Sequence, residues 1–207
     1  MTRELFYILD AVGTVAFAMA GTFKAVRHRL DILGILVLGF VTAMGGGVIR
    51  DALLQRTPVV FLGNGPAFFS LVGCVLASLW HAFAEPLKTQ GEERAFLFVD
   101  GVGLAVFAVT GARMGVDAGL TTWSVVLLAA LTGVGGGAIR DMLVREIPLV
   151  LHADFYATAA LIGGLVYAVL HRLSAPPPLT SLAAFGVTLV LRTMAIWRGW
   201  HLPRLTR

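Results

Sequence analysis

A ten-residue phrase that occurs twice is the strongest constraint on how this chain can fold. Residues 45–54 read GGGVIRDALL and residues 135–144 read GGGAIRDMLV, so the second copy starts 90 positions after the first. Each copy places three consecutive glycines and an Arg-Asp pair inside or at the end of a long apolar run. Glycine destabilises a helix, and a charged side chain is costly in the hydrocarbon of a membrane. Because the chain contains this unfavourable combination twice, we infer that the glycines and the charges have a function.

The repeat extends well beyond the phrase. Sliding the chain on itself by 90 positions aligns 9–61 with 99–151 without a gap, and Asp10 then matches Asp100. Apolar sequence matches itself by chance at Leu, Val and Ala, but not at Asp, Arg, Pro and a glycine triplet in one register. The sequence therefore predicts two copies of one structural unit.

The composition is that of an integral membrane protein. The chain is 57% hydrophobic and 14% charged, with a mean hydropathy of +0.85, whereas soluble domains carry about 25% charged residues. A membrane span needs about 20 mostly apolar residues, and windows of that length indicate several spans. The predicted spans are 5–23, 32–54, 66–84, 95–113, 120–144, 154–172 and 180–197.

Each copy of the repeat contains three spans, which is an odd number, so the second copy must enter the membrane from the opposite side. This predicts an all-α membrane protein with seven transmembrane helices: an inverted three-plus-three repeat and a seventh helix, with kinks in the second and fifth. The predicted segments are 5–87 for the first repeat, 88–94 for a linker, 95–173 for the second repeat, 180–197 for the seventh helix and 198–207 for a basic C-terminal tail.

Lysine and arginine set the expected orientation. The connectors on one side of the membrane hold most of these residues, when Arg50 and Arg140 are left out as intramembrane. Because basic loops stay in the cytoplasm, we expect an outside N-terminus and a cytoplasmic C-terminus. The basic C-terminal end fits a membrane-flanking anchor, since nucleic-acid binding needs a basic face on a soluble module.

The motifs of enzymes and metal centres are missing from the sequence. It has no G-x-S-x-G, P-loop or H-E-x-x-H motif, a single cysteine, and five histidines that form no i,i+4 pair. We therefore expect no enzyme activity, no metal site, no disulfide within the chain and no cofactor.

The two glycine triplets are the first candidate site residues. Each glycine in a helix interior costs roughly 0.5–1 kcal/mol relative to alanine, so three in a row predict a kink or a break. A break frees carbonyl groups, which are good cation ligands. Close helix packing is the alternative, but recurrence in an inverted repeat favours kinked, pore-lining helices. The triplets are Gly45, Gly46, Gly47, Gly135, Gly136 and Gly137.

The Arg-Asp pairs follow each triplet, with Arg50 beside Asp51 and Arg140 beside Asp141. Their spacing places both charges about one helical turn beyond the glycines. The inverted topology places the two pairs near opposite membrane surfaces. We interpret them either as gates of a pore or as structural ion pairs that lock the helix ends.

Two more pairs of equivalent residues are candidates. Asp10 and Asp100 open the first and fourth spans, either as helix caps or as carboxylates that attract cations to a pore. Phe17 and Phe107 are either packing residues or a hydrophobic constriction that gates by dewetting. Hydroxyls in helices commonly bond back to their own helix, but two of them recur three residues before a triplet and are candidate pore groups. They are Thr42 and Thr132.

With these spans, the doubled Gly-Gly-Gly-x-x-Arg-Asp motif and the basic C-terminal end, the chain resembles a prokaryotic member of the trimeric intracellular cation channel (TRIC) family. Its repeat is also called a glycine transporter domain. The resemblance covers about 10–195. It implies a symmetric homotrimer in the inner membrane, one pathway per protomer, permeation of monovalent cations favouring K⁺, and kinks at the triplets. The lipid-binding Lys-Glu-Val signature of the animal channels is absent, so phosphoinositide binding is not expected.

Three functions follow from these observations. The first is a K⁺-preferring channel, with Na⁺ as the other candidate permeant ion and membrane lipid and further copies of the chain as partners. The second is a secondary transporter of a small amino acid such as glycine, in which half-helix N-termini hold a carboxylate. The third is a scaffold whose triplets only pack helices. The resemblance favours the channel.

Overall fold

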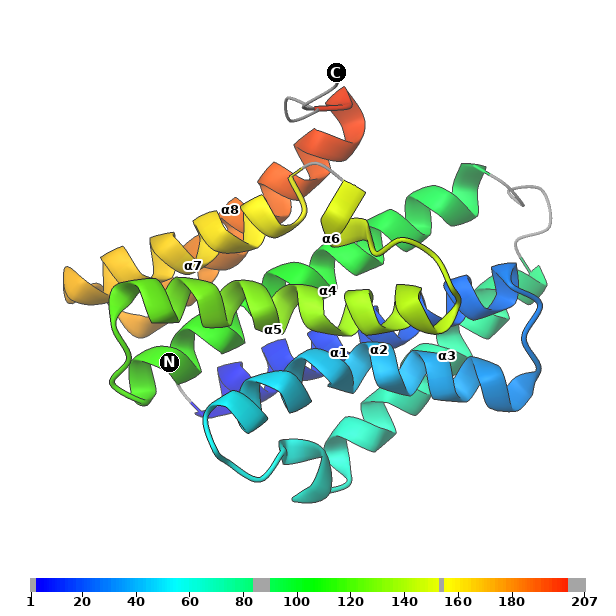
Figure 1. Ribbon diagram of the computed structural model, residues 1–207, viewed down its shortest axis with the longest axis horizontal. Coiled ribbons are helices and arrows are strands. Elements are labelled where there is room, and N and C mark those ends of the chain that lie inside the picture. Colours follow the sequence, from blue (N-terminus) through cyan, green and yellow to red (C-terminus); the bar gives the residue numbers. More distant parts are fainter. Residues whose placement is uncertain (1–2, 84–89, 153–154, 201–207) are drawn as a thin grey trace.

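The computed structural model describes residues 3–83, 90–152 and 155–200. These residues form eight α-helices and one short 3-10 helix, arranged in a single bundle (Figure 1). The elements are α1 (Arg3–Arg27), α2 (Ile32–Leu53), η1 (Val59–Phe61), α3 (Gly65–Phe83), α4 (Gln90–Asp117), α5 (Thr122–Leu143), α6 (Leu149–His152), α7 (Ala157–Arg172) and α8 (Pro177–Arg198).

The helix count agrees in outline with the sequence prediction. Within the described residues, six helices are long and apolar enough to cross a membrane, namely α1, α2, α3, α4, α5 and α8. The remaining long helix, α7, is apolar but has only 16 residues. The helix α4 begins at Gln90 and so includes most of the predicted linker 88–94. Beyond 200, the predicted tail lies outside the described residues.

The two repeats run through the bundle in opposite directions, as Figure 1 shows for α1 and α4, which pack against each other. The third helices occupy equivalent places, because α3 packs on α1 and α2 while α7 packs on α4 and α5. Outside the repeat, α8 covers α7 and α4. The inverted arrangement places equivalent residues of the repeats at opposite ends of the bundle.

The repeat is preserved in the turns that end the helices. After α1 and α4, a residue in the left-handed region closes the helix, Arg29 with φ 55° and Gly119 with φ 70°. After α2 and α5 the same conformation recurs at Gln55 with φ 53° and Arg145 with φ 59°. Backbone N–H groups in each turn return to the last helical carbonyls, which is the usual left-handed helix ending. The sequence copies therefore fold alike down to single backbone angles.

The glycine triplets lie where α2 and α5 touch. A methyl group on Gly46 would overlap the carbonyl oxygen of Thr132, and one on Gly136 would overlap the carbonyl oxygen of Thr42. The backbone remains α-helical through both triplets. The helices α2 and α5 are therefore not broken at the triplets, and a kink without a break stays a prediction. Small residues here serve close backbone contact, which the low volume of glycine makes possible.

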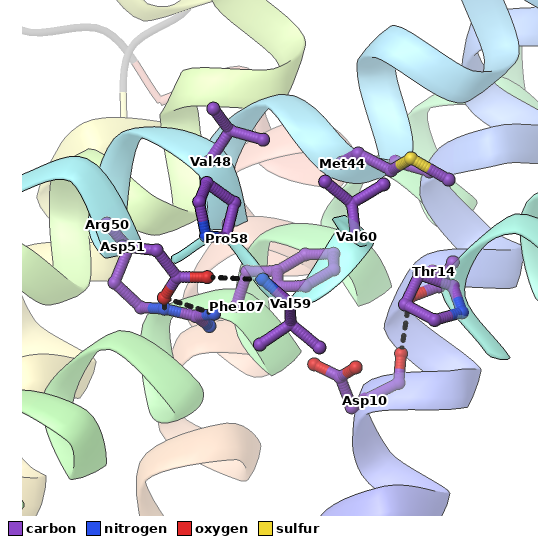
Figure 2. A pocket seen from close by; sticks show the side chains of 13 residues that line it. Asp10, Thr14, Met44, Val48, Arg50, Asp51, Pro58, Val59, Val60 and Phe107 are labelled. Atoms are coloured by element: carbon purple, nitrogen blue, oxygen red, sulfur yellow. Dashed lines mark hydrogen bonds and ion pairs between the residues drawn. The ribbon is translucent and has the colours of Figure 1, made fainter. Parts of the chain in front are cut away.

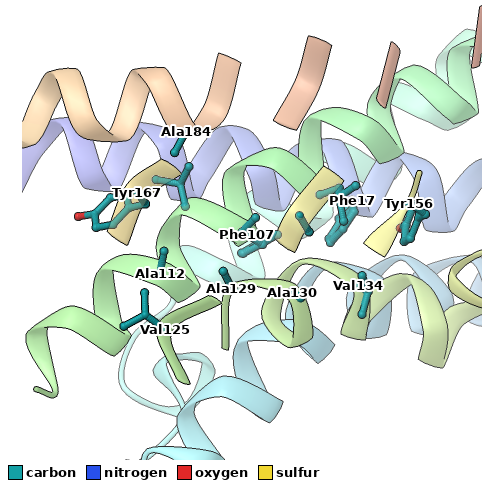
Figure 3. Close-up of a cluster of buried hydrophobic side chains, with 14 of the residues drawn as sticks. Phe17, Phe107, Ala112, Val125, Ala129, Ala130, Val134, Tyr156, Tyr167 and Ala184 are labelled. Atoms are coloured by element: carbon teal, nitrogen blue, oxygen red, sulfur yellow. The ribbon is translucent and has the colours of Figure 1, made fainter. Parts of the chain in front are cut away.

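A second crossing brings α1 and α4 together around two aromatic rings. The centroids of Phe17 and Phe107 are 5.2 Å apart, with their planes inclined by 25°. Both rings are buried in the main apolar cluster (Figure 3). A methyl group on Gly103 would overlap the Phe17 ring, and one on Gly13 would lie 3.4 Å from the Phe107 ring. The two equivalent glycines thus make room for the two equivalent rings.

Candidate functional site

Each Arg-Asp pair forms a buried ion pair between neighbours on one helix. The Nε of Arg50 donates to Oδ1 of Asp51 at 2.8 Å, and the Nε of Arg140 donates to Oδ1 of Asp141 at 2.9 Å. All four side chains are buried. Charges withdrawn from water in this way need a partner at close range, and each pair supplies one.

The second oxygen of each aspartate fastens the connector that follows its helix. Oδ2 of Asp51 accepts the backbone N–H of Val59 at 3.0 Å, and Oδ2 of Asp141 accepts that of Leu149 at 3.0 Å. These bonds span eight residues in both repeats. These hydrogen bonds are what a locking role requires, and the role as a gate stays a prediction.

The two pairs lie at opposite ends of α1. Lys24, in the last turn of that helix, has its Nζ 3.6 Å from Oδ1 of Asp141. At the other end, the Arg50–Asp51 pair and Asp10 line one cavity together (Figure 2). Each end of the bundle therefore carries a charged cluster built on one Arg-Asp pair. Because the backbone is the same in both repeats, the two clusters differ only in the side chains around the pair.

The cavity at the Asp10 end has a volume of about 40 Å³, which is room for a few water molecules. Among the residues that line this Asp10 cavity are Asp10, Thr14, Gly47, Arg50, Pro66 and Phe107. In Figure 2 the carboxylate of Asp10 stands apart from the Arg50–Asp51 pair. Among the described residues this carboxylate has no hydrogen-bond or ion-pair partner. The backbone carbonyl of Asp10 accepts the Thr14 hydroxyl at 2.8 Å.

At the opposite end, the equivalent aspartate is closed off. Oδ1 of Asp100 accepts a 2.6 Å bond from Nη1 of Arg140, and both side chains are fully buried. The ring of Phe96 lies under the guanidinium, with 4.8 Å between its centroid and Cζ of Arg140. The second repeat thus forms a compact triad of Asp100, Arg140 and Asp141, whereas the first leaves Asp10 facing an open cavity.

A further charged group at this end was not singled out by the sequence analysis. Glu146 forms an ion pair with Lys24, and its Oε1 lies 2.6 Å from Nε2 of His28. Partial burial opposes ionisation of this carboxyl, but the hydrogen bonds from Lys24 and His28 outweigh it and lower its pKa. The signal in the sequence is a mismatch between the repeats, because the positions equivalent to Lys24 and Glu146 hold Met114 and Arg56.

The remaining candidates divide between packing and the cavity. The hydroxyls of Thr42 and Thr132 each donate to a carbonyl of their own helix at 2.6 Å, and both side chains lie at helix crossings. Phe107 lines the inner wall of the Asp10 cavity. Its ring also stacks on the buried Phe17, so the aromatic pair adjoins that cavity.

Comparison with known proteins gives consistent relatives. A family profile described as "Glycine transporter" matches residues 7–82 and 97–172. The UPF0126 inner membrane protein YadS of Escherichia coli strain K12 is 40% identical over 199 residues, which is 96% of this chain and 94% of that protein. The UPF0126 membrane protein YvgT of Bacillus subtilis strain 168 is 41% identical over 160 residues, which is 77% of each chain.

Solved structures resemble the whole bundle. A prokaryotic TRIC channel crystallised in 0.5 M KCl has a TM-score of 0.87 and 34% identity, over 96% of this chain and 99% of that one. The TRIC orthologue from Rhodobacter sphaeroides has a TM-score of 0.85 and 34% identity, over 96% and 100% of the two chains. A trimeric intracellular cation channel from C. elegans, at 15% identity and a TM-score of 0.62, shares the fold alone.

Proposed function

Because the chain belongs to the prokaryotic trimeric intracellular cation channel family, we propose that it is a K⁺-preferring cation channel of a bacterial inner membrane. The observation that carries this proposal is the Asp10 cavity. It presents a carboxylate without a partner among the described residues to a space large enough for water, at one end of a membrane-spanning bundle. Such a group attracts cations and offers them a ligand on entry.

The charges around the cavity fit a monovalent ion. Asp10, Arg50 and Asp51 together carry one net negative charge, because the arginine and its neighbouring aspartate neutralise each other. A single carboxylate holds a monovalent cation weakly enough for it to leave again, which conduction requires. Both K⁺ and Na⁺ meet this condition, and the preference for K⁺ rests on the likeness to the family.

The pathway lies within one chain. The Asp10 cavity is lined by residues of α1, α2, η1, α3 and α4, and its lining includes Phe107 of the Phe17–Phe107 pair at the α1–α4 crossing. This supports one pore per protomer of a homotrimer. In this arrangement α7, whose 16 residues extend about 24 Å, is the sixth of seven spans, and α8 is the seventh. The N-terminus lies outside and the C-terminus in the cytoplasm.

The glycine triplets act as pivots in this channel. The backbones of α2 and α5 touch through glycine, and among the described neighbours of Gly45 and Gly135 the only side chains at this crossing are Ile139 and Ile49. A bend at either triplet then tilts one half of a helix while one isoleucine slides over glycine, and it changes the width of the pathway at Gly47 or Gly137. The kinks expected from the sequence belong to this opening movement.

An amino-acid transporter is not favoured. Carriers of this kind hold a substrate carboxylate at the N-terminus of a half-helix, and both α2 and α5 continue without interruption through their triplets. The one unpartnered group of the Asp10 cavity is itself a carboxylate, which repels the carboxylate of an amino acid.

Recording from the purified protein in planar bilayers tests the channel. With KCl at unequal concentrations on the two sides, we expect discrete current steps whose reversal potential follows the K⁺ gradient. Replacing K⁺ by Na⁺ on one side then measures the preference between the two. Electrically silent protein that accumulates labelled glycine in proteoliposomes would instead identify a carrier.

A further inference from the structure

Three buried polar atoms at the Asp100 end lack a hydrogen bond of good geometry among the described residues, although the side chains of Tyr156 and Asp100 lie close enough to interact. The three atoms are Oδ2 of Asp100, Nη2 of Arg140 and the hydroxyl of Tyr156. Each of these side chains is at most 1% exposed. A buried polar group without a partner is unfavourable, and several at one place indicate an occupant or an alternative arrangement of the site.

The three groups converge on the last glycine of the second triplet. A methyl group on Gly137 would lie 2.8 Å from the Tyr156 hydroxyl, 3.5 Å from Nη2 of Arg140 and 3.7 Å from Oδ1 of Asp100. We call the space bounded by Gly137, Asp100, Arg140 and Tyr156 the Gly137 chamber. The absence of a side chain on Gly137 is what allows the tyrosine hydroxyl to enter it.

The first repeat shows the same place without the tyrosine. The position equivalent to Gly137 is Gly47, and the position equivalent to Tyr156 is Pro66, and both line the Asp10 cavity. A methyl group on Gly47 would meet only Nη2 of Arg50, at 3.8 Å. The space beside Gly47 is therefore open, with Pro66 at its edge, whereas the equivalent space beside Gly137 is filled by Tyr156.

The tyrosine is held by a helix that the repeats do not share. The guanidinium of Arg192, in α8, lies 4.8 Å from the centroid of the Tyr156 ring. The arginine is buried, and its Nε has no partner among the described residues. A cation over an aromatic face is attractive, and more so away from water. The repeat supplies the chamber, and α8 supplies the group that keeps the ring in it.

The backbone beside the tyrosine is strained. Phe155 has φ 58°, in the left-handed region that a bulky side chain rarely adopts. Tyr156 follows directly and precedes the first residue of α7. Strained backbone of this kind is common in switch regions, where a segment of the chain can adopt two conformations.

We propose that Tyr156 is the gate of the cation pathway at the Asp100 end. In the closed arrangement its ring fills the Gly137 chamber, and in Figure 3 it continues the row of buried rings formed by Phe107 and Phe17. When the ring withdraws, Oδ2 of Asp100 faces an open chamber as the Asp10 carboxylate faces its cavity. The triad of Asp100, Arg140 and Asp141 carries one net negative charge by itself, and Lys24, whose Nζ lies 3.6 Å from Asp141, balances it on the Asp141 side. This inference rests on the proposed channel function.

Single-channel recording of Tyr156→Ala in planar bilayers tests the gate. We expect the fraction of time spent open to rise by roughly tenfold or more, because the closed state loses a buried ring. Tyr156→Phe keeps the ring and should stay within about twofold of the wild type. Tyr167→Ala is the matched control, since it removes a buried tyrosine from the same stretch of chain, in α7, away from the chamber.

A second variant, Gly137→Ala, tests the gate even if Tyr156→Ala does not fold. Gly137→Ala places a methyl group against the tyrosine hydroxyl and should also raise the open fraction, whereas Gly186→Ala meets nothing within 4 Å and should not. A wild type that conducts while Tyr156→Ala and Gly137→Ala open no more often than their controls would overturn the gate alone. A silent wild type would overturn the channel function on which the gate depends.

Discussion

Asp10 and Asp100 occupy equivalent positions in the two repeats, but only Asp100 is neutralised by an arginine. Its Oδ1 accepts a 2.6 Å bond from Nη1 of Arg140, whereas the Asp10 carboxylate faces the Asp10 cavity beside an arginine that pairs with Asp51 instead. One fold thus holds the same residue in two electrostatic states. The two ends of the bundle should respond differently to the same substitution.

Replacing each aspartate by asparagine should change the free energy of unfolding by different amounts. Asp100→Asn leaves Arg140 with a weakened counter-charge in a fully buried place, so we expect a loss of about 3–5 kcal/mol in the free energy of unfolding. Asp10→Asn removes no ion pair seen among the described residues and should cost less than about 1 kcal/mol. Thermal unfolding in detergent measures both. Equal losses would contradict the difference between the repeats.

The contact between α2 and α5 predicts a second effect. Gly46→Ala and Gly136→Ala each drive a methyl group into a backbone carbonyl of the partner helix, which cannot move aside as a side chain could. We expect each to destabilise the protein by about 1–3 kcal/mol, the range for overpacked cores. Gly186→Ala is the control, because a methyl group there meets nothing within 4 Å. Unfolding midpoints that match the control would show that the helices do not touch at the triplets.

The pH dependence of stability should report the ion pairs of Glu146. Hydrogen bonds from Lys24 and His28 lower the pKa of this carboxyl in the folded state. The stabilisation is therefore present above the pKa of the unfolded chain, about 4.3, and is lost as the pH falls through the folded value. We expect Glu146→Gln to unfold at a lower temperature than the wild type at neutral pH.

The two proteins should converge as the solution is acidified, since protonated Glu146 no longer accepts an ion pair. Unfolding midpoints measured from about pH 7 to about pH 3.5 follow this convergence. The side chain is 38% exposed, so water screens the pair and the gap should be modest. A gap that stays constant down to the lowest pH would contradict the role of the carboxylate.

Much of the fold could be predicted from the sequence because the two repeats match at Asp, Arg, Pro and Gly, which rarely align by chance in apolar sequence. The three-plus-three pattern and its inversion follow from an ungapped register and an odd number of spans. The role of the triplets could not be predicted, because a kinked helix and a closely packed one both call for glycine. The carbonyls of Thr42 and Thr132 opposite them show the close packing, and the kink stays a prediction.

The difference between the two ends was also hidden from the sequence. Reasoning from the repeat treats Asp10 and Asp100 as equals, and what separates them lies where the repeat is broken. Tyr156 stands at the position of Pro66, and Arg192 comes from a helix with no counterpart. Side chains that come together only through tertiary packing leave no periodic signal, so mismatches between the copies are the best guide to them.

Conductance of the Asp10→Asn channel tests the central claim most directly. Single-channel currents of this variant should be recorded in symmetric KCl, alongside the wild type and Asp117→Asn. The latter removes a charge from an exposed aspartate at the end of α4. We predict that Asp10→Asn lowers the K⁺ conductance several-fold at low salt, less so at high salt because ions screen the carboxylate, and that Asp117→Asn changes it little. Equal conductance of the Asp10→Asn and wild-type channels at low salt would contradict a cation pathway that begins at Asp10.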